Sequence, residues 1–210
     1  MEEKQSTNLV GYNGPLENNS KHGHSKIKIG VSGAAETGHC GLNALELAKG
    51  LGREIIKQGG VLITGATSGF PLWVSIGAKE ERGVVIGFSP ASSEKEHIEG
   101  FRLPTDYTDL IVYTGFGFAG RDLLFTRACD AVLFGCGRIG TIHEFTIAYE
   151  DGKPIGILVG PWITDTEMQD IIKNGNVPSD NVIIDDDPRR LLEKVIKKVE
   201  EQKALLYKDH

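Results

Sequence analysis

Three glycine-rich turns carry most of the residues whose types and spacing could do chemistry in this 210-residue chain. The most informative reads "GCGRIGTIHEF" at 135–145, where Gly137 and Gly140 precede Thr141. Glycines let backbone N–H groups approach an anion closely, and the N-terminus of a following helix favours negative charge. This turn therefore predicts a binding site for one phosphate group, to which the Thr141 hydroxyl and the Arg138 cation contribute.

Glu144 follows Thr141 by three residues, in a segment with helical periodicity. A threonine and a glutamate at this spacing are typical of a capping box, in which both side chains satisfy backbone groups at a helix N-terminus. The same carboxylate would lie one helical turn from a bound phosphate. There it could position water or a sugar hydroxyl, or stabilise a cationic transition state. The two roles are compatible, and the sequence leaves both open.

Arg121 is the second candidate catalytic residue. The pattern predicts that it begins the preceding helix, after the turn "GFGFAG". A cation at a helix N-terminus is electrostatically unfavourable, so this placement favours an anionic partner for Arg121. A solvated surface arginine would have the same sequence, and this alternative stays open.

Two further turns, at 32–41 and 65–70, are rich in Gly, Ser or Thr. They supply the remaining candidate phosphate- or nucleotide-binding residues, which are Gly33, Gly65, Ser68 and Gly69. No lysine lies in any of the three turns, which argues against pyridoxal phosphate chemistry. We predict no cofactor.

Short apolar segments alternate with helical patterns from position 26 onward. Continuously apolar strands that alternate with helices are typical of a parallel sheet covered on both faces. We therefore predict an α/β, doubly wound, Rossmann-like fold with a mainly parallel sheet. Strands are expected at 26–33, 59–65, 84–90, 109–115, 130–135, 154–160 and 181–187, and helices at 42–57, 71–83, 121–129, 141–152, 164–175 and 187–206.

Ligands of such sheets bind beyond the carboxyl ends of the strands. The three glycine-rich turns each follow a predicted strand, so the architecture favours their convergence into one site. Residues 26–210 are expected to form a single nucleotide-binding domain. Residues 1–25 are polar and lack periodicity, which predicts a disordered tail. His22 and His24 in that tail would make a poor metal site, and we predict no metal.

Composition excludes several classes of function. A net charge of −6 argues against broad nucleic-acid binding, and no apolar run approaches the length of a membrane span. The three cysteines, Cys40, Cys129 and Cys136, are odd in number and lack metal-binding spacing. A reducing, cytoplasmic location fits them best.

Two other interpretations of the turn at 135–141 are disfavoured. Residues 135–140 match G-x-G-x-x-G, but the dinucleotide fingerprint belongs in the first βα turn and needs an acidic residue about 20 positions later. The chain meets neither condition, which disfavours a nicotinamide dehydrogenase. Cys136 could be a reactive thiol, yet the sequence places no His/Asn pair to activate it.

The run "GRDLLFTRACDAVLFGCGRIGTIHEF" resembles the signature R-x(many)-D-A-x-x-x-P-G-G-x-G-T-x-x-E of the LOG ("Lonely guy") family. These proteins are also called lysine decarboxylase-like and are related to the DprA/Smf nucleotide-binding proteins. The resemblance covers about residues 26–160. It places the family arginine on Arg121, the glycine–threonine element on Gly137, Gly140 and Thr141, and the family glutamate on Glu144.

This resemblance implies a cytosolic homodimer, or a higher homo-oligomer, with a nucleotide pocket near the subunit interface. It also implies hydrolysis of the N-glycosidic bond of a nucleoside 5′-monophosphate to a free base and ribose 5-phosphate. The expected partner is such a nucleotide or another phosphorylated small molecule, with no nucleic acid and no membrane. Glu144 would serve the ribose and water, and Arg121 would bind anionic oxygen or assist departure of the base.

The chain also departs from the family pattern. Cys136-Gly137-Arg138 replaces Pro-Gly-Gly, and His143 replaces the first of two family glutamates. Arg138 could pair with an extra phosphate or block the original one. Molybdenum-cofactor carriers resemble the same group, so the alternative function is non-catalytic binding of a nucleotide or a phosphorylated cofactor.

Overall fold

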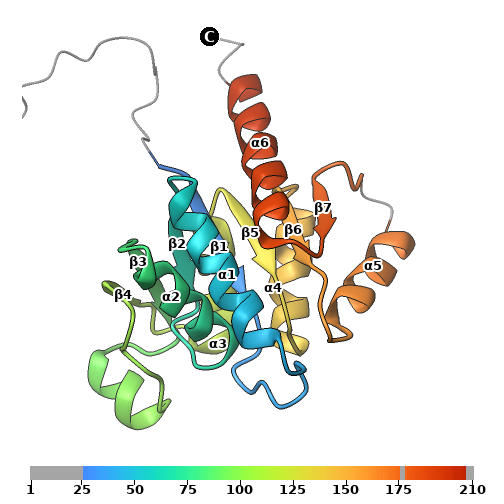
Figure 1. Cartoon of the computed structure of the whole chain (residues 1–210). Coiled ribbons are helices and arrows are strands. Elements are labelled where there is room, and N and C mark those ends of the chain that lie inside the picture. Colours follow the sequence, from blue (N-terminus) through green and yellow to red (C-terminus); the bar gives the residue numbers. More distant parts are fainter. Residues whose placement is uncertain (1–25, 176–177, 207–210) are drawn as a thin grey trace, which may run out of the picture.

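The computed structural model describes residues 26–175 and 178–206, in which short apolar strands form one parallel sheet (Figure 1). Its seven strands have the order β4-β3-β2-β1-β5-β6-β7 within the described residues, and every neighbouring pair is parallel. The strands are β1 (Lys28–Ser32), β2 (Val61–Thr64), β3 (Val85–Ser89), β4 (Leu110–Tyr113), β5 (Ala131–Phe134), β6 (Ile155–Leu158) and β7 (Val182–Asp185).

Helices cover both faces of this sheet (Figure 1). On one face lie α1 (Ala44–Lys57), α2 (Phe70–Glu80) and α6 (Pro188–Leu206), and their core includes Leu51, Phe70 and Leu191. On the other face lie α3 (Gly117–Ala128), α4 (Ile139–Glu150) and α5 (Thr164–Asn174), with Phe125, Phe145 and Met168 in their core. The predicted doubly wound, Rossmann-like fold is confirmed.

The order of the strands creates a crevice between β1 and β5. The chain runs outward from β1 to β4 on one side, and then returns to place β5 on the other side of β1. At such a switch point the loops leave the sheet in opposite directions and open a ligand-binding crevice. The turns after β1 and β5 flank this crevice, and the turn after β2 lies beside them. The three glycine-rich turns therefore converge as expected.

Two helices begin earlier than the sequence predicts. α3 begins at Gly117, so Arg121 lies one turn inside the helix and not at its N-terminus. α4 begins at Ile139, because the last residues of the glycine-rich turn already adopt helical geometry. The Thr141 hydroxyl accepts a hydrogen bond from the Arg138 N–H at 3.4 Å and closes that end of the helix. Of the two roles that the sequence leaves open for Glu144, the capping box with Thr141 does not form, since Glu144 lies beyond the first turn of α4.

The polar loop that follows β3 contains one π-helical turn, η1 (Glu96–Gly100), which the sequence did not predict. His97 anchors this turn in the interior. Its Nδ1 lies 2.8 Å from the Ser89 hydroxyl and its Nε2 lies 3.0 Å from the carbonyl oxygen of Pro104. Both ring nitrogens are thus satisfied within the loop itself.

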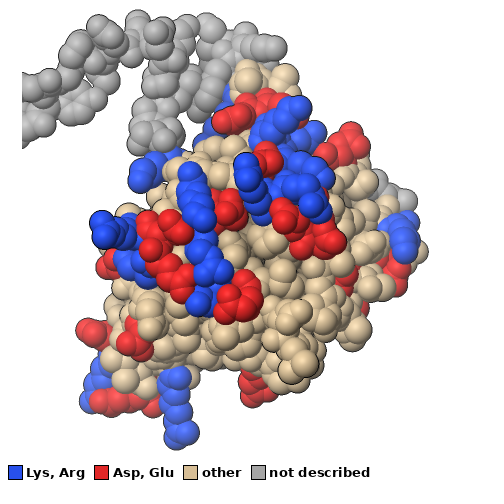
Figure 2. Space-filling view, viewed as in Figure 1, with Lys and Arg blue, Asp and Glu red and all other residues tan. Residues whose placement is uncertain are grey.

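Charged side chains of both signs alternate over α1, α2 and α6 on the face shown in Figure 2. Lys49 and Glu80 form one of these pairs at 2.7 Å, and Arg189 and Glu193 form another at 2.9 Å. This face therefore carries no broad basic area of the kind that binds nucleic acid without sequence preference. No helix among the described residues is long and apolar enough to cross a membrane. The predicted tail at 1–25, with its two histidines, lies outside the described residues.

Candidate functional site

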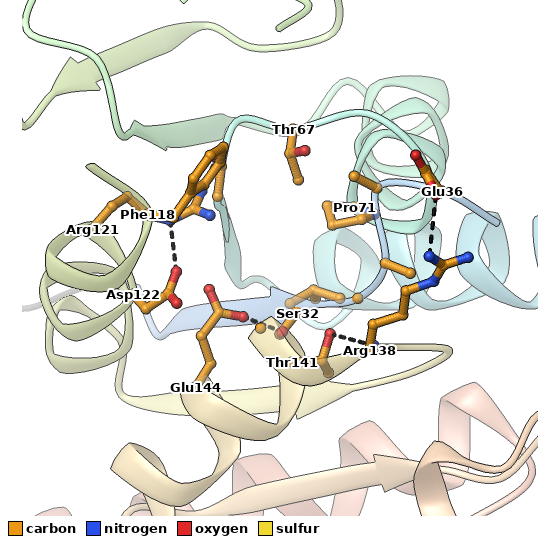
Figure 3. Close-up of a pocket in the computed structure, with 16 residues that line it drawn as sticks. Ser32, Glu36, Thr67, Pro71, Phe118, Arg121, Asp122, Arg138, Thr141 and Glu144 are labelled. Carbon is orange, nitrogen blue, oxygen red and sulfur yellow. Dashed lines mark hydrogen bonds and ion pairs between the residues drawn. The ribbon is translucent and has the colours of Figure 1, made fainter. Parts of the chain in front are cut away.

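A cavity of about 420 Å³ opens at the carboxyl ends of β1, β2 and β5 (Figure 3). Most of the predicted site residues line it, although they come from all three turns and from two helices. These are Gly33, Gly65, Arg121, Arg138, Gly140, Thr141 and Glu144. The lining also includes residues that the sequence analysis missed, among them Ser32, Glu36, Thr67, Phe118 and Asp122.

Three predicted binding residues stand outside the lining, and each has a structural role. Ser68 donates its hydroxyl to the carbonyl of Ala35 at 3.3 Å. Gly69 precedes α2 with a φ of +71°, a left-handed conformation that glycine adopts without strain. The N–H of Gly137 donates to the Thr164 hydroxyl at 2.9 Å. This N–H is therefore already bonded and is not available to a phosphate.

Gly137 is nevertheless required by packing, because a side chain at this position would overlap the side chain of Thr141. The turn can thus bring the start of α4 to the edge of the cavity. The first N–H groups of an α-helix lack partners within the helix, and Gly140 and Thr141 in this first turn line the cavity. The start of α4, with its partial positive charge, is the part of the turn suited to an anion.

Glu144 lies on α4 with its carboxyl group inside the cavity, facing Asp122 and Ser32 (Figure 3). The Ser32 hydroxyl donates a hydrogen bond to Glu144 Oε2. The pKa of Glu144 is raised to about 8, chiefly by burial and also by the negative charge and hydrogen bond of Asp122, against the lowering effects of Arg121 and Ser32. At neutral pH the Glu144 carboxyl is therefore mostly protonated, and it faces the carboxyl group of Asp122.

Arg121 and Asp122 are consecutive residues of α3 that are both buried. The Arg121 Nε donates to Asp122 Oδ1 at 3.0 Å, and Nη1 donates to the carbonyl oxygens of Gly65 and Phe88. The anionic partner that the sequence predicted for Arg121 thus lies within the protein. Packing requires glycine at position 65, because a Cβ there would overlap the Arg121 guanidinium.

His143 contacts this pair from the outer side of α4. The side chain of His143 is 45% exposed. Its Nδ1 also lies 2.9 Å from Asp122 Oδ2. This link was missed, because it depends on how α3 packs against α4.

Arg138 borders the cavity and does not fill the turn. Its guanidinium is directed to the rim, where Nη1 lies 3.1 Å from Glu36 Oε2 (Figure 3). Its Nε donates to His39 Nδ1 at 3.4 Å. More than half of the side chain is exposed. An extra anionic group of a ligand can therefore reach Arg138 without displacing it.

Cys40 and Cys136 form a disulfide that joins the loop after β1 to the turn after β5. The sequence did not predict this bond, and its cysteine count was interpreted as typical of a reducing compartment. Cys129 is free and buried in the other core, and burial raises the pKa of its thiol. Cytoplasmic location stays a prediction.

His39, which the sequence alone could not place beside Cys136, brings its Nε2 within 3.4 Å of Cys136 Sγ. The ligand atoms of His39, Cys40 and Cys136 all lie within 4.8 Å of one another. The two sulfur atoms are bonded to each other, however, and Nε2 lies 3.0 Å from the carbonyl oxygen of Gly137. In this state the cluster offers no set of free metal ligands.

Comparison with known proteins agrees with the fold. A model of the SLOG cluster4 family matches residues 26–192. An uncharacterized protein of Archaeoglobus fulgidus is 30% identical over 139 residues, which are 66% of this chain and 84% of that protein. The matched family region contains all three turns that form the cavity.

Several solved structures are similar. The molybdenum cofactor binding protein of Rippkaea orientalis has a TM-score of 0.68 and 27% identity, with 83% of this chain and 98% of that chain covered. The molybdenum cofactor carrier protein of Chlamydomonas reinhardtii has a TM-score of 0.66 and 24% identity over 83% and 99% of the two chains. DprA of Streptococcus pneumoniae has a TM-score of 0.61 and 14% identity over 80% and 62%. The last two likenesses establish the fold alone.

Proposed function

The chain belongs to the SLOG cluster4 family, and on this premise we propose that it hydrolyses the N-glycosidic bond of a nucleoside 5′-monophosphate. Its fold is the nucleotide- and cofactor-binding fold of that family. The single observation that carries the proposal is the buried carboxyl pair of Glu144 and Asp122, which lies in the same cavity as the start of α4. Binding a phosphorylated ligand alone would not require such a pair.

The proposed arrangement places the 5′-phosphate on the first turn of α4, near Gly140 and Thr141. The ribose then lies within reach of Glu144, one helical turn further along. In the reaction the bond between ribose C1′ and the base nitrogen breaks, and positive charge develops on the ribose ring. The net negative charge of the carboxyl pair stabilises that charge in a buried, weakly screened site.

The carboxyl pair also suits the proton transfers of this reaction. Water attacks C1′, and one of its protons passes to the carboxylate of the pair, while the pair's existing proton is available to the departing base. The products are the free base and ribose 5-phosphate, so one water is consumed and the pair regains its original proton count. Arg121 acts as a positioning residue in this scheme, because its guanidinium orients Asp122 and binds the turn after β2.

A second function is supported by a specific likeness. The molybdenum cofactor binding protein of Rippkaea orientalis is 27% identical, and its chain is covered almost completely. Arg138 on the cavity rim would suit a ligand with an additional anionic group. The second candidate is therefore a carrier that holds a phosphorylated cofactor or nucleotide without turnover.

One experiment separates the two functions. The purified full chain is incubated with AMP, GMP, CMP and UMP, and free base is measured by chromatography. The hydrolase proposal expects base release that falls at least about 10²-fold in Glu144→Gln. Glu150→Gln, at the exposed end of the same helix, is the matched control and should retain the activity.

Binding is measured on the same samples. Native mass spectrometry of freshly purified protein and calorimetry with each nucleotide report occupancy. Tight binding or a copurified pterin without base release would overturn the hydrolase and support the carrier. Neither binding nor turnover with any phosphorylated small molecule would contradict both.

We also propose that the protein is a homodimer or a higher homo-oligomer in the cytoplasm. Large apolar side chains are exposed on and near the elements that form the cavity. They include Phe116, which precedes α3, Phe118 of α3, Ile139 of α4 and Ile163. Burial of such side chains is a usual reason for subunit association. Light scattering coupled to size-exclusion chromatography tests this, and a monomer at micromolar concentration would contradict it.

A further inference from the structure

We propose that Cys40 and Cys136 form a thiol–disulfide exchange site whose substrate is a dithiol, with Cys136 as the sulfur that leaves as thiolate. The bond joins the loop after β1 to the turn after β5, two segments that also border the cavity, and both cysteines are buried. The exchange reaction goes beyond the proposed function and does not depend on it.

The surroundings of Cys136 favour negative charge on its sulfur. The Nε of Arg138 donates to His39 Nδ1, which therefore acts as the acceptor and leaves the ring proton on Nε2. This N–H faces the carbonyl of Gly137 at 3.0 Å and Cys136 Sγ at 3.4 Å. Hydrogen-bond donors, nearby cations and a helix N-terminus all stabilise a thiolate. His39 supplies the donor to Cys136 Sγ, Arg138 contacts that same histidine ring, and α4 begins three residues after Cys136.

Cys40 is the sulfur that a reductant can reach. It lies on the loop after β1, where the neighbouring residues are largely exposed: Gly38, His39, Gly41 and Leu42. The side chain of Cys40 itself is buried. Attack therefore requires only this loop to open locally, whereas Cys136 is enclosed by the turn after β5. Local opening of exposed loops costs far less free energy than global unfolding.

The exchange balances in two steps. A thiolate of the dithiol attacks Cys40 Sγ, the Cys40–Cys136 bond breaks, and Cys136 leaves as thiolate while Cys40 forms a mixed disulfide with the reductant. The second thiol of the reductant then attacks its own sulfur in the mixed disulfide and releases Cys40. The protein gains two electrons and two protons, and the dithiol is oxidised to a disulfide.

Cys129 does not take part in this exchange. It is buried in the core beneath α3 and α4, and burial raises the pKa of its thiol. Cys40 and Cys136 are buried as well, but they lie on a loop and a turn, whereas Cys129 follows α3 within the core and would be exposed only by wider unfolding. Reactivity toward thiols and alkylating agents is thus confined to one pair of sulfurs, and Cys129 is an internal reference for it.

Reduction would also loosen the cavity rim. Without the covalent bond, the loop after β1 is held to the turn by weaker contacts, such as the 2.8 Å hydrogen bond from the Ala34 N–H to the Cys136 carbonyl and the exposed Arg138–Glu36 pair. Reduction should therefore change the affinity for anions bound at the start of α4. This consequence, unlike the exchange itself, rests on the proposed phosphate site.

The first experiment counts thiols in the native full chain. The protein is equilibrated in dithiothreitol buffers of graded ratio, labelled with a maleimide and digested for mass spectrometry. Two labels are expected, on Cys40 and Cys136, while Cys129 stays unlabelled until denaturant is added. Cys129→Ser should behave like the wild type. Labels that appear only together with unfolding, or a bond that excess dithiothreitol leaves intact in the folded protein, would overturn the proposal.

The second experiment tests the role of His39. Cys136 is alkylated with iodoacetamide in a Cys40→Ser protein, and the rate is compared after the further change His39→Phe. A decrease of about fivefold or more is expected, because the donor to the thiolate is lost. Cys40 in a Cys136→Ser protein is the matched control and should change less than about twofold. Equal slowing of both thiols would contradict the assignment of Cys136.

A third experiment identifies the reductant. Reduction by catalytic amounts of a thioredoxin-type protein would assign a protein dithiol, and reduction by small dithiols alone would assign a small one. One Zn²⁺ bound per reduced chain, with reoxidation blocked, would overturn the proposal in favour of a metal site.

Affinity for inorganic phosphate is then measured in both redox states, with Cys40→Ser/Cys136→Ser as the control that cannot respond to dithiothreitol. A change of about threefold or more in the wild type alone is expected. Exchange without such a change would overturn only the link to the cavity. No phosphate binding in either state would count against the proposed function and leave the exchange site standing.

Discussion

His143 Nδ1 lies 2.9 Å from Asp122 Oδ2, and Asp122 in turn faces the carboxyl group of Glu144 inside the cavity (Figure 3). His143 is half-exposed, whereas both carboxyl groups are buried. These three side chains therefore connect solvent with the interior of the cavity. In the proposed hydrolysis the pair gives one proton to the base and takes one from water, and the hydrogen bond from His143 holds Asp122 in position for these transfers.

The first prediction concerns His143. His143→Ala removes the hydrogen bond to Asp122 and should lower the rate of base release by roughly tenfold, because Asp122 is no longer held in the orientation that accepts a proton from water. His143→Asn keeps a polar group near the position of Nδ1 and should restore part of the rate. The values of kcat and KM for the two variants decide the role, since a positioning role lowers kcat and leaves KM nearly unchanged. An unchanged kcat in His143→Ala would show that His143 serves packing alone.

The second prediction follows from the raised pKa of Glu144. The ordinary value is 4.5 and the folded value is about 8. The folded state therefore binds a proton more tightly than the unfolded state. This contribution to stability is fully present below about pH 4.5 and is lost as pH rises through about 8, at up to about 1.4 kcal/mol for each pH unit.

Glu144→Gln should remove this pH dependence, because the neutral amide does not titrate. The free energy of unfolding, measured by urea denaturation from pH 5 to 9, should fall with rising pH more steeply in the wild type than in the variant. Glu150→Gln, at the exposed end of α4, controls for the helix itself. Parallel curves for the wild type and Glu144→Gln would contradict the buried, protonated carboxyl.

The α/β architecture could be predicted because its signal is local. Residues such as Ile155–Leu158 form a short apolar run bounded by turns. Such a run is enough to identify a strand that is buried on both faces of a parallel sheet. The order of the strands could not be predicted. It depends on the return of the chain from β4 to β5, and nothing local in the sequence encodes which side of β1 receives β5.

The same distinction holds for the site. Gly33, Gly140 and Glu144 were found because turns after strands and residues one helical turn later can be located along the chain. Asp122 was missed, since its link to Glu144 depends on how α3 packs against α4. The Cys40–Cys136 bond was missed for a similar reason. It requires β1 and β5 to be neighbours, and the two cysteines are 96 residues apart.

The third prediction concerns the buried Arg121–Asp122 pair. Asp122→Asn leaves the Arg121 guanidinium buried without its counter-charge, which should destabilise the fold by about 3 kcal/mol or more. Arg127 and Asp151 form a comparable pair near the surface, with the Arg127 side chain 60% exposed. Asp151→Asn should cost less than about 1 kcal/mol. Both losses of unfolding free energy are measured by urea denaturation. Similar losses in the two variants would contradict the expectation that burial makes the Arg121–Asp122 pair the more costly one to break.

The fourth prediction concerns Arg138, which stands where the family pattern has glycine. Its guanidinium forms an ion pair with Glu36 at the rim of the cavity and does not cover the first turn of α4. Arg138→Gly should therefore weaken nucleotide binding by about tenfold, because a charge-assisted hydrogen bond to the ligand is lost. Thermal stability should change little, since the side chain is largely exposed. Calorimetry with AMP measures the effect, and Arg189→Gln on the exposed face of α6 is the control. Tighter binding in Arg138→Gly would show the opposite, that the arginine obstructs the phosphate turn.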